Sequence, residues 1–173
     1  MLPGASERFI EIPEGIEGSA ATLRRMAELI RQPDRVVDDF TDILSAASDD
    51  PVQNVRTLYE WVRSKMLYTP DFNNGIIIEE IRTPGYLLHE IVTFGSALGD
   101  CDDYVVLYGA VLYRMGFPVT LEAVSTHPDQ QLDHVYLSTM VDGHRIPLDG
   151  IVQEPFGWEI PENEVTNRMA ELV

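Results

Sequence analysis

The sequence predicts an α+β fold, because helical patterns fill its first part and strand patterns fill its last part. Three amphipathic helices come first, one helix that is apolar on all sides follows, and three strand-like segments come after that helix. Helices and strands that are segregated along the chain are typical of this class, whereas a parallel sheet would need them to alternate. With 173 residues, one domain is expected over residues 1–173, with a helical part at 19–67 and a core at 68–160.

Apolar residues recur every three or four positions in three segments before residue 67, as they do on one face of a helix. Ser19 is the expected cap of the first helix, which ends before Pro33. The third helix is expected to have Asp50 as its cap and Pro51 as its first residue. The predicted buried faces are, in order, Leu23, Met26, Ala27 and Ile30; Val36, Val37, Phe40, Ile43 and Leu44; and Val52, Val55, Leu58, Tyr59, Val62 and Met66.

Between residues 69 and 99 the periodicity is lost, because prolines and glycines interrupt every short apolar run. An irregular stretch of this length is uncommon inside a compact domain and is often a binding loop. Helical character returns at Cys101 and ends at Gly116, and nine residues between 105 and 115 are apolar or aromatic. A helix without a polar face is expected to be buried.

Strand patterns occupy residues 119–125, 135–141 and 144–148, and the tail after residue 162 shows a weak helical pattern. Asp142 and Gly143 form a strong signal for a two-residue turn, so the last two strands should form a hairpin. In that hairpin Val141 faces His144, so the residue numbers of any two residues that face each other sum to 285.

This register makes a specific prediction about three polar residues. Tyr136 faces Asp149, and His134 lies two residues along on the same face, so His134 is a diagonal neighbour of Asp149. A carboxylate at that position can orient an imidazole ring. By the same parity, His144 points to the other face of the sheet.

Cys101 is the one cysteine of the chain, and it begins the apolar helix directly after Asp100, the expected cap. A helix start favours a thiolate through its N–H groups and its dipole. Asp102 and Asp103 are like charges that oppose this effect, so a base or a histidinium partner is needed. The alternative is a small, buried and inert cysteine.

Cys101, His134 and Asp149 together have the arrangement of a cysteine triad, in which the thiolate attacks, the imidazole moves the proton and the carboxylate holds the tautomer. The second ring nitrogen of His134 is expected to face the Cys101 sulfur within about 3–4.5 Å. The Cys101 amide is one expected oxyanion donor. Four upstream residues are chemically able to supply another, and the sequence does not choose among Tyr68, Asn73, Asn74 and His89.

The segments GDCDDYVVLYGAVLYRMGFPV, LDHVYL and IPLDG resemble the transglutaminase-like superfamily, whose core motifs are a cysteine at a helix start, a histidine on a strand and an aspartate on the next strand. The resemblance covers about residues 59–158. It implies a papain-like core and acyl transfer on amide bonds, as a peptidase, an amidase or a transamidase, without a metal or an organic cofactor. Prokaryotic members are more often regarded as cysteine proteases than as crosslinking enzymes, and small members resemble proteins of phage and prophage gene clusters.

Two other interpretations use the same residues. The fold can persist as a non-catalytic module that binds peptides or proteins, for example as a phage or prophage component. A metal site would use His127, Asp133, His134 and His144, but their spacing matches no compact zinc motif and parity separates His134 from His144. The acidic run at 100–103 is expected to cap the helix and to be solvated, since it lacks the pattern of a calcium-binding loop.

Charge and hydropathy exclude several classes of partner. Twelve Lys and Arg residues against 29 Asp and Glu residues give a net charge of -17, which argues against binding to nucleic acid or to an anionic membrane surface. No apolar run approaches the ~20 residues of a membrane span, and the first residues lack the order of a signal peptide. A cytoplasmic protein is therefore the expectation, and the resemblance implies a peptide or protein amide substrate.

Overall fold

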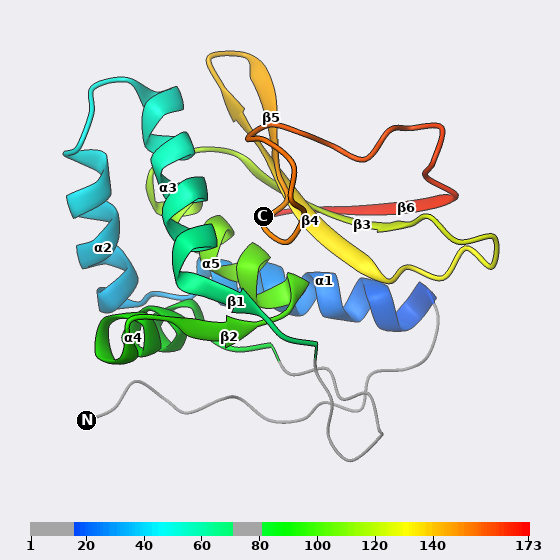
Figure 1. Cartoon of the computed structure of the whole chain (residues 1–173), viewed down its shortest axis with the longest axis horizontal. Coiled ribbons are helices and arrows are strands. Elements are labelled where there is room, and N and C mark those ends of the chain that lie inside the picture. Colours follow the sequence, from blue (N-terminus) through cyan, green and yellow to red (C-terminus); the bar gives the residue numbers. More distant parts are fainter. Residues whose placement is uncertain (1–15, 71–80) are drawn as a thin grey trace.

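The computed structural model of the chain describes residues 16–70 and 81–173, and in it the helices lie to one side of a four-stranded sheet (Figure 1). The predicted α+β class is confirmed. The helices are α1 (Ile16–Arg31), α2 (Arg35–Ser45), α3 (Pro51–Lys65), α4 (Pro84–Phe94) and α5 (Cys101–Arg114); the strands are β1 (Met66–Tyr68), β2 (Ala97–Gly99), β3 (Val119–Ser125), β4 (His134–Val141), β5 (His144–Leu148) and β6 (Asn167–Leu172).

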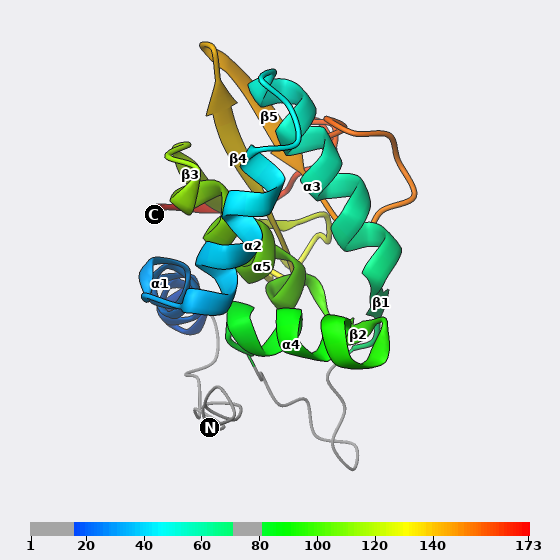
Figure 2. The same cartoon turned by 90° about the vertical axis from the view of Figure 1, so that its left-hand side faces the viewer.

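Helix α5 lies at the centre of the molecule, as its apolar sequence predicts. Figure 2 shows it surrounded by α1, α2, α3 and α4, and it also contacts β2, β3 and β4. All residues from 102 to 112 are buried. At Gly109 an added Cβ would lie 2.6 Å from Ile30 Cδ1, so α1 packs directly on the glycine.

The outer helices begin where short polar side chains satisfy their first N–H groups. The Asp34 carboxylate accepts from Val36 N at 2.8 Å, and Asp50 caps α3 with Pro51 as the first helical residue, as predicted. The predicted cap of the first helix is wrong, because α1 begins at Ile16 and Ser19 lies inside it. Glu17 supplies the negative charge that favours this earlier start.

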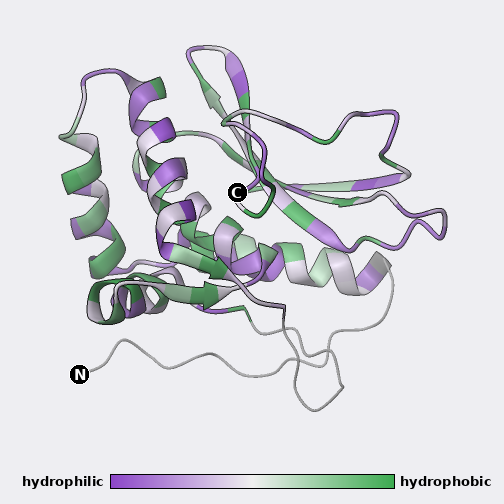
Figure 3. Cartoon of the chain, viewed as in Figure 1, coloured by the Kyte–Doolittle hydropathy of each residue, from purple (hydrophilic) through white to green (hydrophobic). Residues whose placement is uncertain are grey.

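The predicted faces of the helices are largely confirmed. In Figure 3, α2 and α3 alternate between hydrophobic and hydrophilic bands, as helices with one buried face do. In α2 the prediction is wrong for two residues: Val36 is exposed and Ile43 is 74% exposed. The reason is a small rotation of the buried face, which includes Val37, Thr41 and Leu44.

The stretch that the sequence predicted to be irregular contains α4 and β2, so this prediction is wrong for residues 84–99. The Thr83 hydroxyl accepts from Tyr86 N, Pro84 is the first helical residue, and Gly95 ends the helix with φ +86°. The proline and glycine that interrupt the apolar pattern are therefore the two ends of a helix. Residues 71–80, which carry part of the same prediction, lie outside the described residues.

The main sheet has the order β5-β4-β3-β6 and is antiparallel, while β1 and β2 form a separate parallel pair. Val141 faces His144 and Leu137 faces Leu148, which confirms the predicted hairpin and its register. Asp142 and Gly143 both have positive φ, as a two-residue hairpin turn requires.

The helical tendency predicted for the tail is wrong, because β6 pairs with the edge of β3. The backbone N–H and C=O groups of an unpaired edge need partners, and the tail supplies them.

The two faces of the sheet differ in chemistry. Leu137 packs toward Gly109 of α5, whereas Tyr136 and Ser138 point to a cluster of charged side chains on the opposite face. The Ser138 hydroxyl donates to the buried Glu122 at 2.6 Å, and Tyr136 donates to Glu159 at 2.6 Å. We call this set the ionic cluster; its charged members are Glu122, Arg145, Glu159 and Arg168.

The ionic cluster predicts a loss of stability in acid. The hydrogen bond from Arg145 lowers the pKa of Glu159 from 4.5 to about 2. Because the pKa of the folded state is the lower one, this contribution to stability is present above pH 4.5 and is lost as the pH falls toward 2. The urea midpoint should therefore drop between pH 5 and pH 2.5, and Glu159→Gln should start lower and drop less. If the urea midpoints of the wild type and of Glu159→Gln fell by the same amount between pH 5 and pH 2.5, this account would be contradicted.

Candidate active site

The hairpin brings His134 and Asp149 into direct contact. His134 is the first residue of β4, and Asp149 follows Leu148, the last residue of β5. His134 Nε2 lies 2.7 Å from Asp149 Oδ2, and only 17% of the imidazole is exposed. The contact that the register predicts is confirmed.

Asp149 is 3% exposed, and its oxygen atoms have partners. Oδ2 contacts His134 Nε2, Oδ1 accepts from Ile151 N at 3.3 Å, and the backbone oxygen accepts from the Tyr59 hydroxyl at 3.1 Å. Burying a polar group without hydrogen-bond partners is costly, so these contacts stabilise Asp149 in its buried position. With Nε2–H donating to a carboxylate, the neutral imidazole has Nδ1 as its acceptor atom. The approach of Nδ1 to the Cys101 sulfur stays a prediction.

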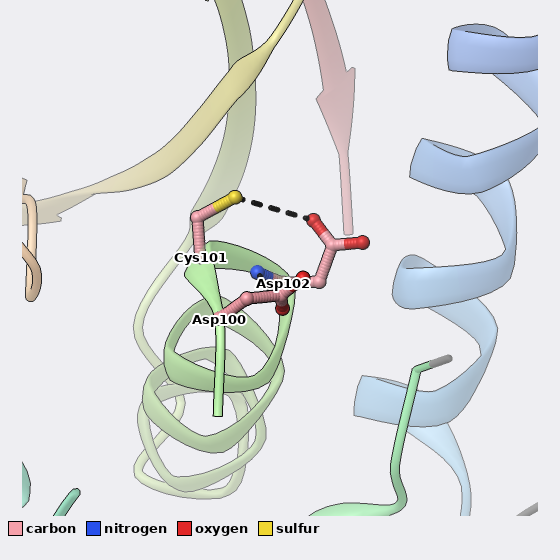
Figure 4. Close-up of side chains that lie close together, drawn as sticks. All are labelled: Asp100, Cys101 and Asp102. Atoms are coloured by element: carbon pink, nitrogen blue, oxygen red, sulfur yellow. Dashed lines mark hydrogen bonds between the residues drawn. The ribbon is translucent and has the colours of Figure 1, made fainter. Parts of the chain in front are cut away.

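Cys101 begins α5, and the residue as a whole is partly exposed. Asp100 caps the helix as predicted, because its carboxylate accepts from Asp102 N at 3.2 Å. Figure 4 shows the Cys101 sulfur and the Asp102 carboxylate pointing toward each other, with Sγ 3.8 Å from Oδ1. This contact favours the neutral thiol over the thiolate.

The expectation that the acidic run is solvated is wrong for two of its residues. Asp102 is 5% exposed and Asp103 is fully buried. Asp103 forms an ion pair with the Arg82 side chain and also accepts from Arg82 N at 3.2 Å. The Arg82 charge therefore offsets one of the carboxylates that oppose a thiolate at Cys101.

The four residues of the alternative metal site do not form one group. His134 contacts Asp149, His127 Nε2 lies 3.1 Å from Asp133 Oδ2, and His144 lies beside the hairpin turn. Within residues 16–70 and 81–173, one group of three ligand atoms lies within 4.8 Å, from Asp100, Cys101 and Asp102. These residues are consecutive at a helix start, which accounts for their closeness.

The chain after Asp149 packs against the first turns of α5. At Gly150 an added Cβ would lie 2.4 Å from Tyr104 Cδ1 and 2.9 Å from Tyr108 Cε2. Tyr104 is three residues after Cys101. The backbone at Asp149 and Gly150 therefore lies close to the start of α5, where Cys101 is located.

Tyr68 is the expected oxyanion donor that the structure associates with Cys101. It is paired with Gly99 across β1 and β2, and Thr69 N donates to Gly99 O at 2.9 Å. Partial burial, together with the nearby Cys101 and Asp100 side chains, raises the pKa of the Tyr68 phenol, so its hydroxyl is protonated and can donate. His89 lies within α4, and Asn73 and Asn74 lie outside the described residues.

No sequence motif marks Arg82 as a functional residue, and the helical pattern predicts Tyr59 only as part of an apolar face. The partners of these residues are 21 and 90 positions away along the chain, so no local pattern marks them.

Among the described residues, no helix combines the length and the apolar character that crossing a membrane would require.

Comparison with known proteins supports the fold. No family model matches the chain, and no curated protein matches it significantly. A putative protease from Parabacteroides distasonis is similar in structure, with a TM-score of 0.55 and 18% identity over 89% of this chain. The chain covers only 32% of that protein's length. The likeness shows that the chain shares the fold of that protein, in agreement with the α+β core that the resemblance to transglutaminase-like proteins implies.

Two further structures are more distant. A putative cysteine protease from Cytophaga hutchinsonii gives a TM-score of 0.49 and 12% identity over 86% of this chain and 55% of its own. Calcium-bound LapG from Legionella pneumophila gives 0.44 and 18% over 76% of this chain and 74% of its own.

The close packing at Gly150 can be tested by substitution. Gly150→Ala places a methyl group against Tyr104 and should cost about 1–3 kcal/mol of unfolding free energy. It should also shift the ring resonances of His134, because Asp149 is the adjacent residue. Gly116→Ala is the control, because its Cβ would meet no atom within 4 Å. This variant strains the backbone but should leave the His134 resonances in place; unchanged resonances in Gly150→Ala would contradict the packing argument.

Proposed function

We propose that the chain is a cysteine-dependent acyl-transfer enzyme that acts on amide bonds of peptides or proteins. In this proposal Cys101 is the nucleophile, His134 is the general acid and base, and Asp149 orients the imidazole. The observation that carries the proposal is the 2.7 Å contact between His134 and the buried Asp149. The contact of Gly150 with Tyr104, three residues after the partly exposed Cys101, supports it.

The proposed reaction begins when the thiol proton passes to His134 Nδ1. The sulfur then bonds to the carbonyl carbon, and the resulting oxyanion accepts hydrogen bonds from the Cys101 amide and the Tyr68 hydroxyl. The C–N bond breaks as His134 gives its proton to the leaving amine, and a thioester is left on Cys101. Water attacks the thioester with His134 as base, which releases the acid and restores the thiol. An amine in place of water would give transamidation.

A non-catalytic binding module is the second candidate, and one observation favours it. The Cys101 sulfur faces the carboxylate of the buried Asp102, which stabilises the neutral thiol rather than the reactive thiolate. The proposed enzyme needs the His134 imidazolium to overcome this effect. The comparisons give no support to a phage or prophage origin.

Thiol alkylation separates the two candidates, and it reports on one residue because the chain has one cysteine. At pH 6.5 an ion pair with His134 should make Cys101 react with iodoacetamide about tenfold faster than the same chain in urea. His134→Ala should remove this excess, while His144→Ala, on the other face of the sheet, should keep it. A wild-type rate no higher than that of the unfolded chain would favour the binding module.

Turnover tests the role of the carboxylate. Hydrolysis of fluorescein-labelled casein should fall by about 10²- to 10⁴-fold in Asp149→Asn, because an amide can hold the wrong tautomer and cannot stabilise the imidazolium. Cys101→Ala should be inactive with its fold unchanged, as checked by circular dichroism. Turnover that persists in Cys101→Ala would remove the nucleophile assignment, and full activity in Asp149→Asn would make Asp149 purely structural.

A further inference from the structure

Asp149 lies beyond the last residue of β5, so the sheet ladder does not hold its backbone. Residues 149–158 form no helix or strand. Loops without such pairing are more mobile than the elements they connect, yet a group that orients a catalytic base must be held to within about 0.5 Å. Some other part of the chain must therefore fix this segment.

Two residues of α3 bind the backbone of that segment. The Tyr59 hydroxyl lies 3.1 Å from Asp149 O and 3.4 Å from Glu154 O. Arg63 Nη1 donates to Glu154 O at 2.9 Å, and Nη2 donates to Val152 O at 2.8 Å. Three backbone carbonyls within six residues are thus bound from one helix, and we call this arrangement the α3 clamp.

The two members of the α3 clamp also bind each other. Arg63 Nη1 donates to the Tyr59 hydroxyl at 2.9 Å, which leaves the hydroxyl hydrogen for the carbonyls. Tyr59 is 3% exposed and its ring contacts Tyr108 and Phe156, so its position is fixed by packing. Burial raises the pKa of the Tyr59 phenol, which keeps it protonated and able to donate.

We propose that Tyr59 and Arg63 are positioning residues, which hold the backbone at and after Asp149 so that its carboxylate stays directed at His134. This inference rests on the proposed function, because it gives the α3 clamp a role in the chemistry and not only in stability. Neither residue touches the reacting atoms. They act through Asp149, whose backbone oxygen is the acceptor for Tyr59.

The groups that face Asp149 make this role specific. They include His134 on β4, Tyr59 with Arg63 on α3, and Tyr108 on α5. Burial raises the pKa of Tyr108 well above its usual value, so this phenol stays neutral. His134 is then the group whose position and orientation respond to a displacement of Asp149.

The test is the pH profile of Cys101 alkylation in the full chain. Tyr59→Phe removes the hydroxyl and keeps the ring, and Arg63→Met removes all three hydrogen bonds of the guanidinium group. In each variant the rate at pH 6.5 should fall about tenfold, with the midpoint of the profile displaced upward by about one pH unit. Arg63→Lys should recover part of the rate, since an ammonium can reach one carbonyl but lacks the two-pronged geometry.

Arg114→Met is the matched control. Like Arg63, Arg114 donates to backbone carbonyls, those of Ile30, Gln32 and Ala110, at distances of 2.7–3.2 Å, but it does so at the other end of α5. Its loss should lower the urea midpoint as the loss of Arg63 does, without moving the alkylation profile. This contrast separates positioning from a general loss of stability.

The outcomes distinguish this inference from the proposed function. If the wild-type thiol reacts quickly, depends on His134, and keeps its profile in Tyr59→Phe and Arg63→Met, the positioning role is overturned and the proposed function stands. If Arg114→Met moves the profile equally, the effect is one of stability and the inference is also overturned. If the wild-type thiol shows no dependence on His134, the proposed function fails and the inference fails with it.

Discussion

Helix α5 has no polar face, so water must be excluded from it on every side. Helices α1 to α4 and the sheet provide that cover, and the remaining polar groups of α5 find partners among them: Asp103 pairs with Arg82, and the Tyr104 and Tyr108 hydroxyls donate to backbone oxygens of Met66 and Tyr59. A fully covered helix can meet solvent only near its ends. The partial exposure of Cys101, its first residue, is a direct result of this packing.

Much of this arrangement follows from local sequence patterns. The apolar run predicts the buried helix, and the Asp142-Gly143 turn predicts the strand register and, through it, the contact between His134 and Asp149. The failures concern ambiguous signals. Proline and glycine can break a helix or cap it, and α4 shows the second case. The tail has little preference of its own, so the free edge of β3 decides its conformation.

Other features have no local signature at all. The ionic cluster joins β3, β4, β5, β6 and the loop before β6. The positions of its charged residues in the sequence form no pattern that would predict that they meet. The ion pair of Arg82 and the α3 clamp likewise join segments that are far apart in the sequence. Local patterns therefore identify residues whose side chains are suited to catalysis, while long-range packing decides the environment of each one. At 18% identity, the structural likeness extends to the fold, and the chemistry depends on these side chains.

The two-residue turn also constrains how the site can vary among related chains. His134 and Asp149 are 15 residues apart, on strands joined by this turn. Lengthening the hairpin by one residue in each strand adds two residues to that separation and keeps both side chains on the same face. With a two-residue turn, the interval between this histidine and this aspartate is therefore always odd. An even interval would signal a different turn or a bulge, so the interval alone can guide the alignment of sequences too divergent to be matched residue by residue.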